Sequence, residues 1–368
     1  MRIVLTITND FVTDQRINRI AGSLTEMGHQ VRVFGRKTHA GKMPKPENMK
    51  VTLFDLPVKK GWTFYALFNL RLFFELLNVR FDVVVANDLD TLPATFLAAR
   101  LKRKKIVYDS HEYFTELPEL RYRRFTRKVW LFFEKKMVPK VDRAYTVCGS
   151  IASEYKEKYN IPFEVVRNVP IRNTKDIPPP KQYFIWPPNH VILYQGAVNM
   201  GRGLELAIQT MAYLDNTTLI ILGSGTIIEE LKQLVNDLDM QNKVILPGRI
   251  DKSYLKYYTR KADLGISLEE DMGLSYRYAL PNKLFDYIQA EIPVLVSDLP
   301  EMKKIIKTYQ VGEVLIGRQP ENLAKVFKEM LFDKEKRAVW KTNLGKAAKQ
   351  LCWENEAQKL EAIFDFKT

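Results

Sequence analysis

Cysteine is scarce in this chain, with two residues in 368, Cys148 and Cys352, that form no Cys-x-x-Cys pair. Such cysteines support neither a disulfide framework nor a metal site, and a reducing cytoplasm is the simplest setting. Long hydrophobic runs are also missing. The N-terminus MRIVLTI passes directly into an apolar strand pattern, and the aromatic run that starts at Gly61 already ends at Arg71. We therefore expect neither a secretory signal nor a membrane-spanning helix.

Motifs that would identify several other enzyme classes are absent. The first strand is followed by TNDFVTDQR in place of Gly-x-Gly-x-x-Gly. This argues against a dinucleotide dehydrogenase, because the pyrophosphate needs those glycines for close backbone approach. No Gly-x-Ser-x-Gly indicates a hydrolase, and no His/Cys cluster indicates zinc.

Acidic residues are too few to balance the basic ones. The chain has 43 Asp and Glu against 57 Lys and Arg, which gives a net charge of +14. This excess predicts attraction to a polyanion, and composition leaves open nucleic acid, an anionic membrane and a phosphorylated substrate. A length of 368 residues exceeds one ordinary core and predicts two domains.

What the chain does contain is a repeated alternation of apolar strands and helical segments. The first half reads as strands RIVLTI, VRVFG, FDVVVAND, KKIVYDS, RAYTVCG and FEVVRNV, with helices over residues 14–27, 92–101 and 150–159. After a proline-rich segment the alternation restarts with HVILYQG, TLIILGSG, NKVILPG, ADLGISL and IPVLVSD, with helices from residues 203, 226 and 281. Apolar strands joined by helices indicate parallel pairing, so we predict an α/β fold with two doubly wound domains.

The proline-rich segment sets the expected domain boundaries. Prolines deny hydrogen bonds to helix and sheet, so residues 170–189 are interpreted as a linker. We predict an N-terminal domain over 1–169 and a C-terminal domain over 190–352. A helix over about 353–368 is expected to pack back on the N-terminal domain, with Trp353 and Phe364 as candidate packing residues.

Parallel sheets bind ligands just beyond the carboxyl ends of their strands. Gly196 follows one such strand, and Arg202 precedes a helix start, where free N–H groups and the helix dipole suit an anion. A solvated arginine at a loop edge is the alternative. In the first half, His111 follows KKIVYDS directly and could donate to a substrate hydroxyl or phosphate, although a structural histidine is equally open.

The stretch ALPNKLFDYIQAEIPVLVSD begins a helix in an unusual way. Pro281 suits the first helical turn and Asn282 could cap it, but Lys283 places a cation where the helix dipole disfavours one. A bound anion would offset that cost, and Asp286 could accept hydrogen bonds from sugar hydroxyls. The alternative is that Lys283 reaches water and Asp286 merely favours the dipole. Either interpretation leaves three residues in the core: Leu284, Phe285 and Ile288.

Together these residues resemble the retaining glycosyltransferases of family 4. The segment PNKLFDYIQAEIPVLVSDLPEM resembles the nucleotide-sugar signature of that family. The segments DQRINRIAGSLTEMGHQVRVF, NDLDTLPA, YDSHEYFTELPEL and VVRNVP resemble a bacterial subgroup that builds surface polysaccharides. The similarity spans nearly the whole chain, and it implies the GT-B fold, in which two Rossmann-like domains face each other across a cleft.

The resemblance also implies roles for individual residues. Three residues would serve catalysis: His111, Arg202 and Lys283, the two cations by neutralising the donor diphosphate. The donor-binding set would be Gly196, Ala197, Arg202, Gly225, Arg249, Ile250, Tyr278, Leu280, Pro281, Asn282, Lys283 and Asp286, with Asp286 at the ribose and Arg249 and Ile250 near the nucleobase. The acceptor side would hold Asn9, Asp10, Asp14, Arg16, Asp88 and Glu112.

The chain departs from the family pattern at two places. The first glutamate of the Glu-x7-Glu motif should stand eight residues before Asp286, where this chain has Tyr278. Glu269, Glu270 or Asp271 could take that role if the loop is longer. Many relatives have Gly-Arg where this chain has Gly196-Ala197, so one diphosphate contact is expected to be missing.

The expected activity is transfer of a sugar from a nucleotide-diphosphate sugar to a glycan or lipid-linked acceptor, with retention and without a metal or other cofactor. The alternatives are a binding-only or inactive GT-B protein and a nucleotide-sugar epimerase. Residues 121–143, with LKRKK at 101–105, combine basic and aromatic residues and could face an anionic membrane, or could form an ordinary amphipathic helix. Nucleic acid is not expected as a partner, because no nucleic-acid fold signature accompanies the charge. The sequence does not predict an oligomeric state.

Overall fold

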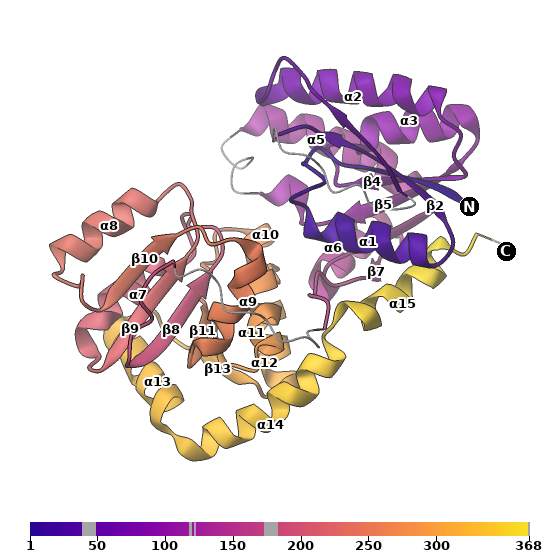
Figure 1. The fold of residues 1–368 in the computed structure, drawn as a ribbon. Helices are drawn as coiled ribbons and strands as arrows, with labels where there is room; N and C mark the ends of the chain where they lie inside the picture. Colours follow the sequence, from indigo (N-terminus) through magenta and orange to yellow (C-terminus); the bar gives the residue numbers. More distant parts are fainter. Residues whose placement is uncertain (39–48, 118–119, 121–122, 173–182, 367–368) are drawn as a thin grey trace. The chain divides into compact units, whose positions relative to one another are not determined.

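The computed structural model describes residues 1–38, 49–117, 120, 123–172 and 183–366, and its residues cluster into two compact units. Unit 1 contains Met1–Asn168, Gly273–Ser275 and Glu356–Thr368, and unit 2 contains Val169–Met272 and Tyr276–Asn355. Half of the proline-rich segment, residues 173–182, lies outside the described part of the chain. Each unit is built around a parallel sheet, as Figure 1 shows.

Unit 1 holds a seven-stranded sheet in the order β3-β2-β1-β4-β5-β6-β7. The strands are β1 (Arg2–Thr6), β2 (Gln30–Arg36), β3 (Met49–Phe54), β4 (Val83–Asn87), β5 (Lys105–Ser110), β6 (Arg143–Thr146) and β7 (Glu164–Val165). The helices between them are α1 (Gln15–Glu26), α2 (Gly61–Asn78), α3 (Leu92–Lys102), α5 (Arg124–Met137) and α6 (Gly149–Tyr159). All strand pairs are parallel, as the apolar strand patterns predict.

Unit 2 holds a six-stranded parallel sheet in the order β10-β9-β8-β11-β12-β13. The strands are β8 (His190–Gln195), β9 (Thr217–Leu222), β10 (Val244–Gly248), β11 (Leu264–Ser267), β12 (Val294–Ser297) and β13 (Gly312–Leu315). The helices are α7 (Leu204–Thr210), α8 (Ile228–Asp237), α9 (Lys252–Lys261), α11 (Asn282–Gln289), α12 (Pro300–Tyr309), α13 (Pro320–Phe332) and α14 (Lys334–Gln350). Two further helices, α10 (Leu274–Arg277) and α15 (Trp353–Phe364), contain residues of both units.

The first helix shows why the sequence folds this way locally. Asp14 is the N-cap of α1, and its side chain accepts a hydrogen bond from the backbone N–H of Ile17. Apolar side chains at Ile17, Ile20, Ala21 and Leu24 are fully buried, a spacing that places them on one helical face. The polar start and the apolar stripe together fix where α1 begins and which side it turns to the sheet.

Sequence patterns did not identify every element. They missed β3 and α2 in unit 1, and α9, α12, α13 and β13 in unit 2. The edge strand β10 contains Pro247, which the edge position tolerates because one side of the strand needs no partner.

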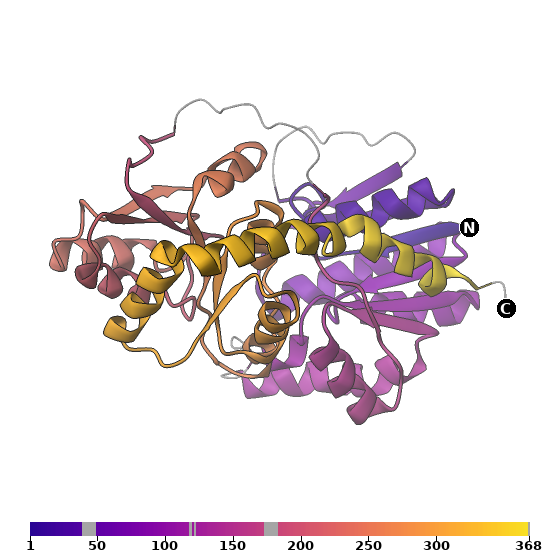
Figure 2. The same cartoon turned by 90° about the horizontal axis from the view of Figure 1, so that it is seen from below.

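The C-terminal end of the chain is helical, and Figure 2 shows α14 and α15 following one another in its yellow part. Trp353 and Phe364 are both buried. Within unit 1, the carboxylate of Glu356 accepts from the backbone N–H of Arg167 at 2.9 Å, and Lys359 donates to the carbonyl of Val165 at 2.9 Å. Among the described helices, none has the length and apolar character needed to cross a membrane.

Candidate functional site

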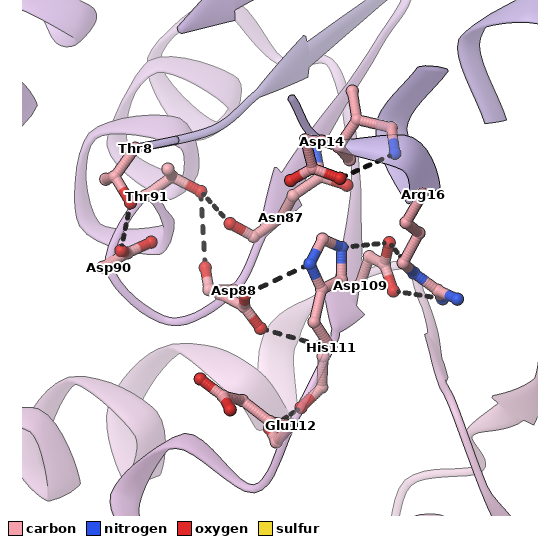
Figure 3. A network of polar contacts seen from close by, with 12 residues as sticks. Thr8, Asp14, Arg16, Asn87, Asp88, Asp90, Thr91, Asp109, His111 and Glu112 are labelled. Carbon is pink, nitrogen blue, oxygen red and sulfur yellow. Dashed lines mark hydrogen bonds and ion pairs between the residues drawn. The ribbon is translucent and has the colours of Figure 1, made fainter. Parts of the chain in front are cut away.

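The carboxyl ends of β1, β4 and β5 bring together the charged residues of unit 1, because these three strands are neighbours in the sheet. Figure 3 shows this cluster. The ring of His111 lies between two carboxylates: Nδ1 is 3.3 Å from Asp88 Oδ2, and Nε2 is 2.9 Å from Asp109 Oδ2. Both ring nitrogens are therefore engaged by protein carboxylates. In this arrangement neither ring nitrogen is left free to donate to a substrate, the role that the sequence had suggested.

The charge state of His111 follows from those two partners. Burial by itself lowers the pKa of His111, but the carboxylates of Asp88 and Asp109 outweigh burial and raise the pKa to about 9. Burial likewise disfavours the charged form of Asp109, yet Arg16 and His111 lower its pKa to about 2. At neutral pH the imidazole is thus a half-buried cation beside the charged carboxylate of Asp109. Burial raises the pKa of Asp88 to about 8, although the nearby His111 lowers it.

Arg16 completes the cluster from α1. Its Nε and Nη2 bind the two oxygens of Asp109 at 3.2 and 2.7 Å, and its Nη1 donates to the carbonyl of Val166 at 2.8 Å. The side chain is almost wholly buried. The guanidinium of Arg16 thus contacts Asp109, which in turn contacts His111.

The backbone supports the same arrangement at Asp88. This residue has a φ of 66°, a left-handed conformation that aspartate tolerates better than most side chains. Its carboxylate also accepts from the backbone N–H of His111 at 2.7 Å, while its own N–H donates to the carbonyl of Asp109 at 2.8 Å. The turn after β4 is thereby tied to the end of β5.

The remaining acceptor-side candidates of unit 1 differ in their surroundings. Asp10 is buried and accepts from Val12 and Thr38, so it shapes its own loop, and Asp14 caps α1. Asn9 is exposed, and Glu112 is also accessible at the end of β5. The structure therefore leaves Asn9 and Glu112 as the more accessible members of this set.

Sequence reasoning did not select Asp90, which lies on the loop after β4. Its Oδ2 accepts from Thr8 at 2.5 Å, while its buried Oδ1 has no partner among the described residues. Burial raises the pKa of Asp90 to about 7, despite the hydrogen bond from Thr8. The signal in the sequence was the second acid of NDLD, two residues after Asp88.

In unit 2, the loops after β8 and β9 approach each other closely. A Cβ on Gly223 would lie 1.8 Å from the carbonyl oxygen of Gly196, and a Cβ on Gly225 would lie 2.0 Å from that of Val198. Only glycine fits at these two positions without moving the backbone. The glycines thus serve loop packing, which sets the path of the chain beyond Gly196.

Two cations and one acid meet at the carboxyl edge of the second sheet. Lys283 Nζ is 2.7 Å from Glu269 Oε1, and Arg202 Nη1 is 3.5 Å from the same oxygen. Glu269 is almost fully buried and also accepts from Ser267 at 2.7 Å. Burial disfavours its charged form, but Lys283 and its other partners hold the pKa of Glu269 below the usual value.

Lys283 itself is buried, so the alternative in which it reaches water is wrong. Its ammonium lies 4.0 Å from the centre of the Tyr194 ring, a contact that stabilises a desolvated cation. Its Cε would be 3.7 Å from a Cβ on Gly196. The lysine stem therefore runs along the glycine loop that follows β8.

Arg202 is more open than Lys283. The guanidinium carbon lies 5.2 Å from the centre of the Tyr276 ring, and its buried Nε has no partner among the described residues. The pair therefore carries two positive charges against the single carboxylate of Glu269. Such an arrangement can accept a further anion without moving either cation.

The three acids that could replace the missing motif glutamate have different partners. Glu270 pairs with Arg318 at 3.3 Å, and Asp271 pairs with Arg277 at 2.8 Å. Only Glu269 lies against the predicted cation pair. The four-residue helix α10 (Leu274–Arg277) lies between these acids and Tyr278, so spacing along the sequence could not single out one of them.

The other donor-side candidates lie near the start of α11. This helix begins at Asn282 with Pro281 as its N-cap, and no side chain caps it, so the expectation that Asn282 is the cap was wrong. Asp286 accepts from Gln195 at 3.1 Å. As expected, Leu284, Phe285 and Ile288 are fully buried.

Tyr278, another donor-side candidate, is half-buried between α10 and α11. Four further candidates are Ala197, Arg249, Ile250 and Leu280. The carbonyl of Ala197 accepts from the Tyr194 hydroxyl. Arg249 is exposed at the end of β10, Ile250 beside it is buried, and Leu280 is half-buried before α11. Of these four, Arg249 has the side chain most accessible to a ligand.

Comparison with known families places both halves of the chain. The model described as Glycosyltransferase Family 4 matches residues 15–170, and the model described as Glycosyl transferases group 1 matches residues 180–347. An uncharacterised glycosyltransferase of Methanocaldococcus jannaschii is 26% identical over 180 residues. That match covers 47% of this chain and 44% of the relative, so the chain spans less than half of that protein.

Solved structures resemble the chain over almost its whole length. Sucrose-phosphate synthase from Thermosynechococcus elongatus has a TM-score of 0.78 at 15% identity, covering 99% of this chain and 98% of that one. WaaG, a glycosyltransferase involved in lipopolysaccharide biosynthesis, has a TM-score of 0.72 at 17% identity, covering 99% and 100%. The Anabaena protein HepE in complex with UDP has a TM-score of 0.74 at 14% identity, covering 98% and 99%. At such low identities these likenesses show the fold.

Proposed function

The chain belongs to the family 4 glycosyltransferases with the GT-B fold, and on this premise we propose that it moves a sugar from a nucleotide-diphosphate sugar to a glycan or lipid-linked acceptor in polysaccharide biosynthesis. The transfer is proposed to be of the hexosyl type, to retain the configuration of the sugar and to need no metal. One observation carries the proposal: Arg202 and Lys283 converge on Glu269 with an excess of positive charge.

In this mechanism the cation pair stabilises the leaving group electrostatically. As the bond between sugar and diphosphate breaks, negative charge grows on the leaving phosphate oxygens. Arg202 and Lys283 already lie in place, so they stabilise this charge without reorganising at the moment of reaction. The acceptor hydroxyl attacks the same face of the sugar, and its proton passes to the leaving diphosphate oxygen as the bond between sugar and diphosphate breaks. Positioning of the two substrates supplies the rest of the acceleration.

Lys283 also lies close to Gly196-Ala197, where the sequence departs from the family pattern. The side chain of Lys283 comes from α11, and its stem runs along the loop where many relatives carry an arginine. We infer that this lysine supplies the diphosphate contact that Ala197 cannot make. Asp286, half-buried on the same helix, is proposed to accept from the ribose hydroxyls, and Arg249 and Ile250 to border the nucleobase.

A nucleotide sugar as donor has support from proteins of the same fold. The Anabaena protein HepE was solved with UDP and with UDP-glucose at TM-scores of 0.74. The two cysteines of this chain are buried free thiols, which suits a reducing compartment, and we propose a cytoplasmic location. For unit 1, we propose that Asn9 and Glu112 contact the acceptor, while Arg16 and Asp109 position His111.

The second candidate is a protein that binds the nucleotide without transferring a sugar. Tyr278 at the position of the first motif glutamate favours it, because the usual carboxylate contact to the donor sugar would be lost. A thermal-shift panel of UDP-, GDP- and ADP-sugars tests both candidates. Binding at a hundredfold excess over Kd should stabilise the protein by about 2.7 kcal/mol.

The variant Lys283→Ala is expected to remove that shift, whereas Lys325→Ala, at an exposed lysine of α13, should keep it. If no nucleotide sugar raises the melting temperature of the wild type, the transferase proposal loses its basis. A shift without release of nucleotide in the presence of glycan acceptors would favour the binding-only protein. The anomeric configuration of the product, read by NMR with and without EDTA, tests retention and metal independence.

A further inference from the structure

The outward face of α2 is apolar, although it lies at the surface of unit 1. The side chains directed to the core are Phe64, Phe68, Leu72 and Leu76, all buried. The opposite side of the same helix exposes Trp62, Leu67, Leu70 and Phe74. Trp62 is 77% exposed, so most of a large aromatic side chain is left in water. A helix with apolar residues on both its buried and its exposed face calls for a partner on its outer side.

Two neighbouring helices extend this apolar surface. Figure 1 shows α2 beside α3, and the contacts of unit 1 place α3 against both α2 and α5. The outward side of α3 exposes Leu97 and Leu101, and that of α5 exposes Phe125, Val129 and Phe132. Phe125 is 81% exposed and Leu101 67%. We refer to the exposed apolar residues of these three helices, with the basic residues around them, as the α2–α3–α5 face.

The orientation of α5 is fixed by its inner side. Trp130 is buried, and its ring lies 5.5 Å from that of Tyr65 on α2. Glu134 is fully buried and pairs with Lys158 at 2.6 Å, while it also accepts from the Tyr159 hydroxyl. The aromatics of residues 121–143 are thus divided between core and surface, and residues 121 and 122 lie outside the described part. The buried contacts of Trp130 and Glu134 therefore direct the outer aromatics of α5 away from the core.

Charge around this face has one sign. Exposed basic residues on α3 and α5 or next to them are Arg100, Arg103, Arg123, Arg124, Lys128, Lys135 and Lys136. Along the three helices the acids are Glu134, which is buried, and Glu75, which pairs with Arg71 at 2.8 Å. The segment LKRKK contributes less than its composition suggests. Lys102 donates to the last carbonyls of α2, and Lys104 and Lys105 pair with Asp82 and Asp142.

We propose that the α2–α3–α5 face docks on an anionic lipid bilayer. The large apolar side chains would enter the boundary between headgroups and acyl chains, and the basic residues would lie against the anionic headgroups. The charge argues against a second copy of the chain as occupant, since two such faces would bring like charges together. Docking would also bring the protein to the surface where a lipid-linked acceptor is presented. The docking proposal does not depend on the transfer reaction.

Sedimentation with lipid vesicles tests the proposal on the full chain. Vesicles of phosphatidylcholine and phosphatidylglycerol in equal parts should bind the protein, and vesicles of phosphatidylcholine alone should bind it far more weakly. The double variant Lys128→Gln/Lys135→Gln should weaken binding roughly fivefold for each charge removed. Trp62→Ser/Phe74→Ser and Phe125→Ser/Phe132→Ser should each weaken it by roughly tenfold or more, because apolar area no longer enters the bilayer.

Matched variants in unit 2 serve as controls. Ile316→Ser/Val339→Ser removes two exposed apolar side chains, and Lys325→Gln/Lys346→Gln removes two exposed charges. Both controls should bind vesicles like the wild type, and all variants should keep the wild-type melting temperature. The proposal is overturned if the wild type ignores anionic vesicles or if the face variants bind like the controls. It is equally overturned if the apolar variants dissolve a dimer and leave vesicle binding unchanged.

Discussion

The two charged clusters of this protein are built from similar residue types but differ in the number of acidic side chains that face their two cations. In unit 1, the two cations Arg16 and His111 face two acidic side chains, those of Asp88 and Asp109. Burial raises the pKa of Asp88 to about 8, whereas Asp109 stays charged at neutral pH. In unit 2, the two cations Arg202 and Lys283 share the single carboxylate of Glu269. The cluster of unit 1, called balanced here because it has as many acidic as cationic side chains, can hold its geometry without a ligand. The cluster of unit 2 has more cations than acidic partners, and on this difference we propose positioning for the first cluster and donor binding for the second.

The largest expected effect comes from breaking the balanced cluster at Arg16. Arg16→Met would leave the fully buried Asp109 with His111 as its remaining cationic partner. Removing one member of a buried ion pair costs roughly 3–5 kcal/mol, so we expect a loss of that order in urea unfolding. The control Arg2→Met removes a surface arginine that pairs with Asp82, and it should have only a small effect. A loss at Arg16 no larger than at Arg2 would contradict the positioning role.

The pH dependence of stability tests whether His111 is protonated in the same cluster. Its pKa is about 9 in the folded protein against about 6.5 when unfolded, so the folded state holds the proton more tightly. The stabilisation is fully present below about pH 6.5 and is lost as pH rises through about 9. Asp88, with a pKa of about 8, and Asp90, with a pKa of about 7, contribute loss in the same direction as pH rises through those values.

His111→Asn should therefore reduce the fall in melting temperature between pH 6.5 and 9, while the part of the fall that comes from Asp88 and Asp90 remains. Melting curves of wild type and variant across this range measure the difference. Equal slopes for the two proteins would mean that His111 is not charged between Asp88 and Asp109.

How much the sequence could predict differs between the two clusters for physical reasons. The strand ends were identified because apolar strands and helices alternate in a regular way, and these ends place Asp88, His111 and Gly196 correctly. The burial of Arg16 was not predictable, because its partner Asp109 is 93 residues away along the chain. Nor could the sequence predict which of the three acids lies against the cation pair. The short helix α10 lengthens the loop after Glu269, so spacing along the chain does not single it out.

The helix α2 was missed for a related reason. An amphipathic pattern needs a polar outer face, whereas α2 exposes Trp62, Leu70 and Phe74 on its outer side. Its charged residues are Arg71 and Glu75, which pair with one another. A surface that deviates from the usual pattern is therefore hard to assign from sequence, and that same deviation indicates a partner.

The smallest expected effect concerns one helix N-cap in each unit. Asp14 caps α1 in unit 1 and accepts from Ile17, and Asp333 caps α14 in unit 2 and accepts from Lys336 at 3.0 Å. Replacing either aspartate by alanine should cost about 1 kcal/mol, since each change removes one N-cap. Urea unfolding of both variants measures this. If Asp14→Ala costs several times more than Asp333→Ala, Asp14 contributes to the charged cluster as well as to the helix.

The central claim is that the cation pair of unit 2 binds a diphosphate because its charge is not balanced. Calorimetric titration of UDP into the wild type, Lys283→Ala and Glu269→Gln measures this most directly. We expect Lys283→Ala to weaken binding roughly tenfold or more, as loss of a charge-assisted contact would. Glu269→Gln should keep or strengthen binding, because the cations then lack their internal anion. Unchanged affinity in Lys283→Ala, or loss of affinity in a folded Glu269→Gln, would contradict the account.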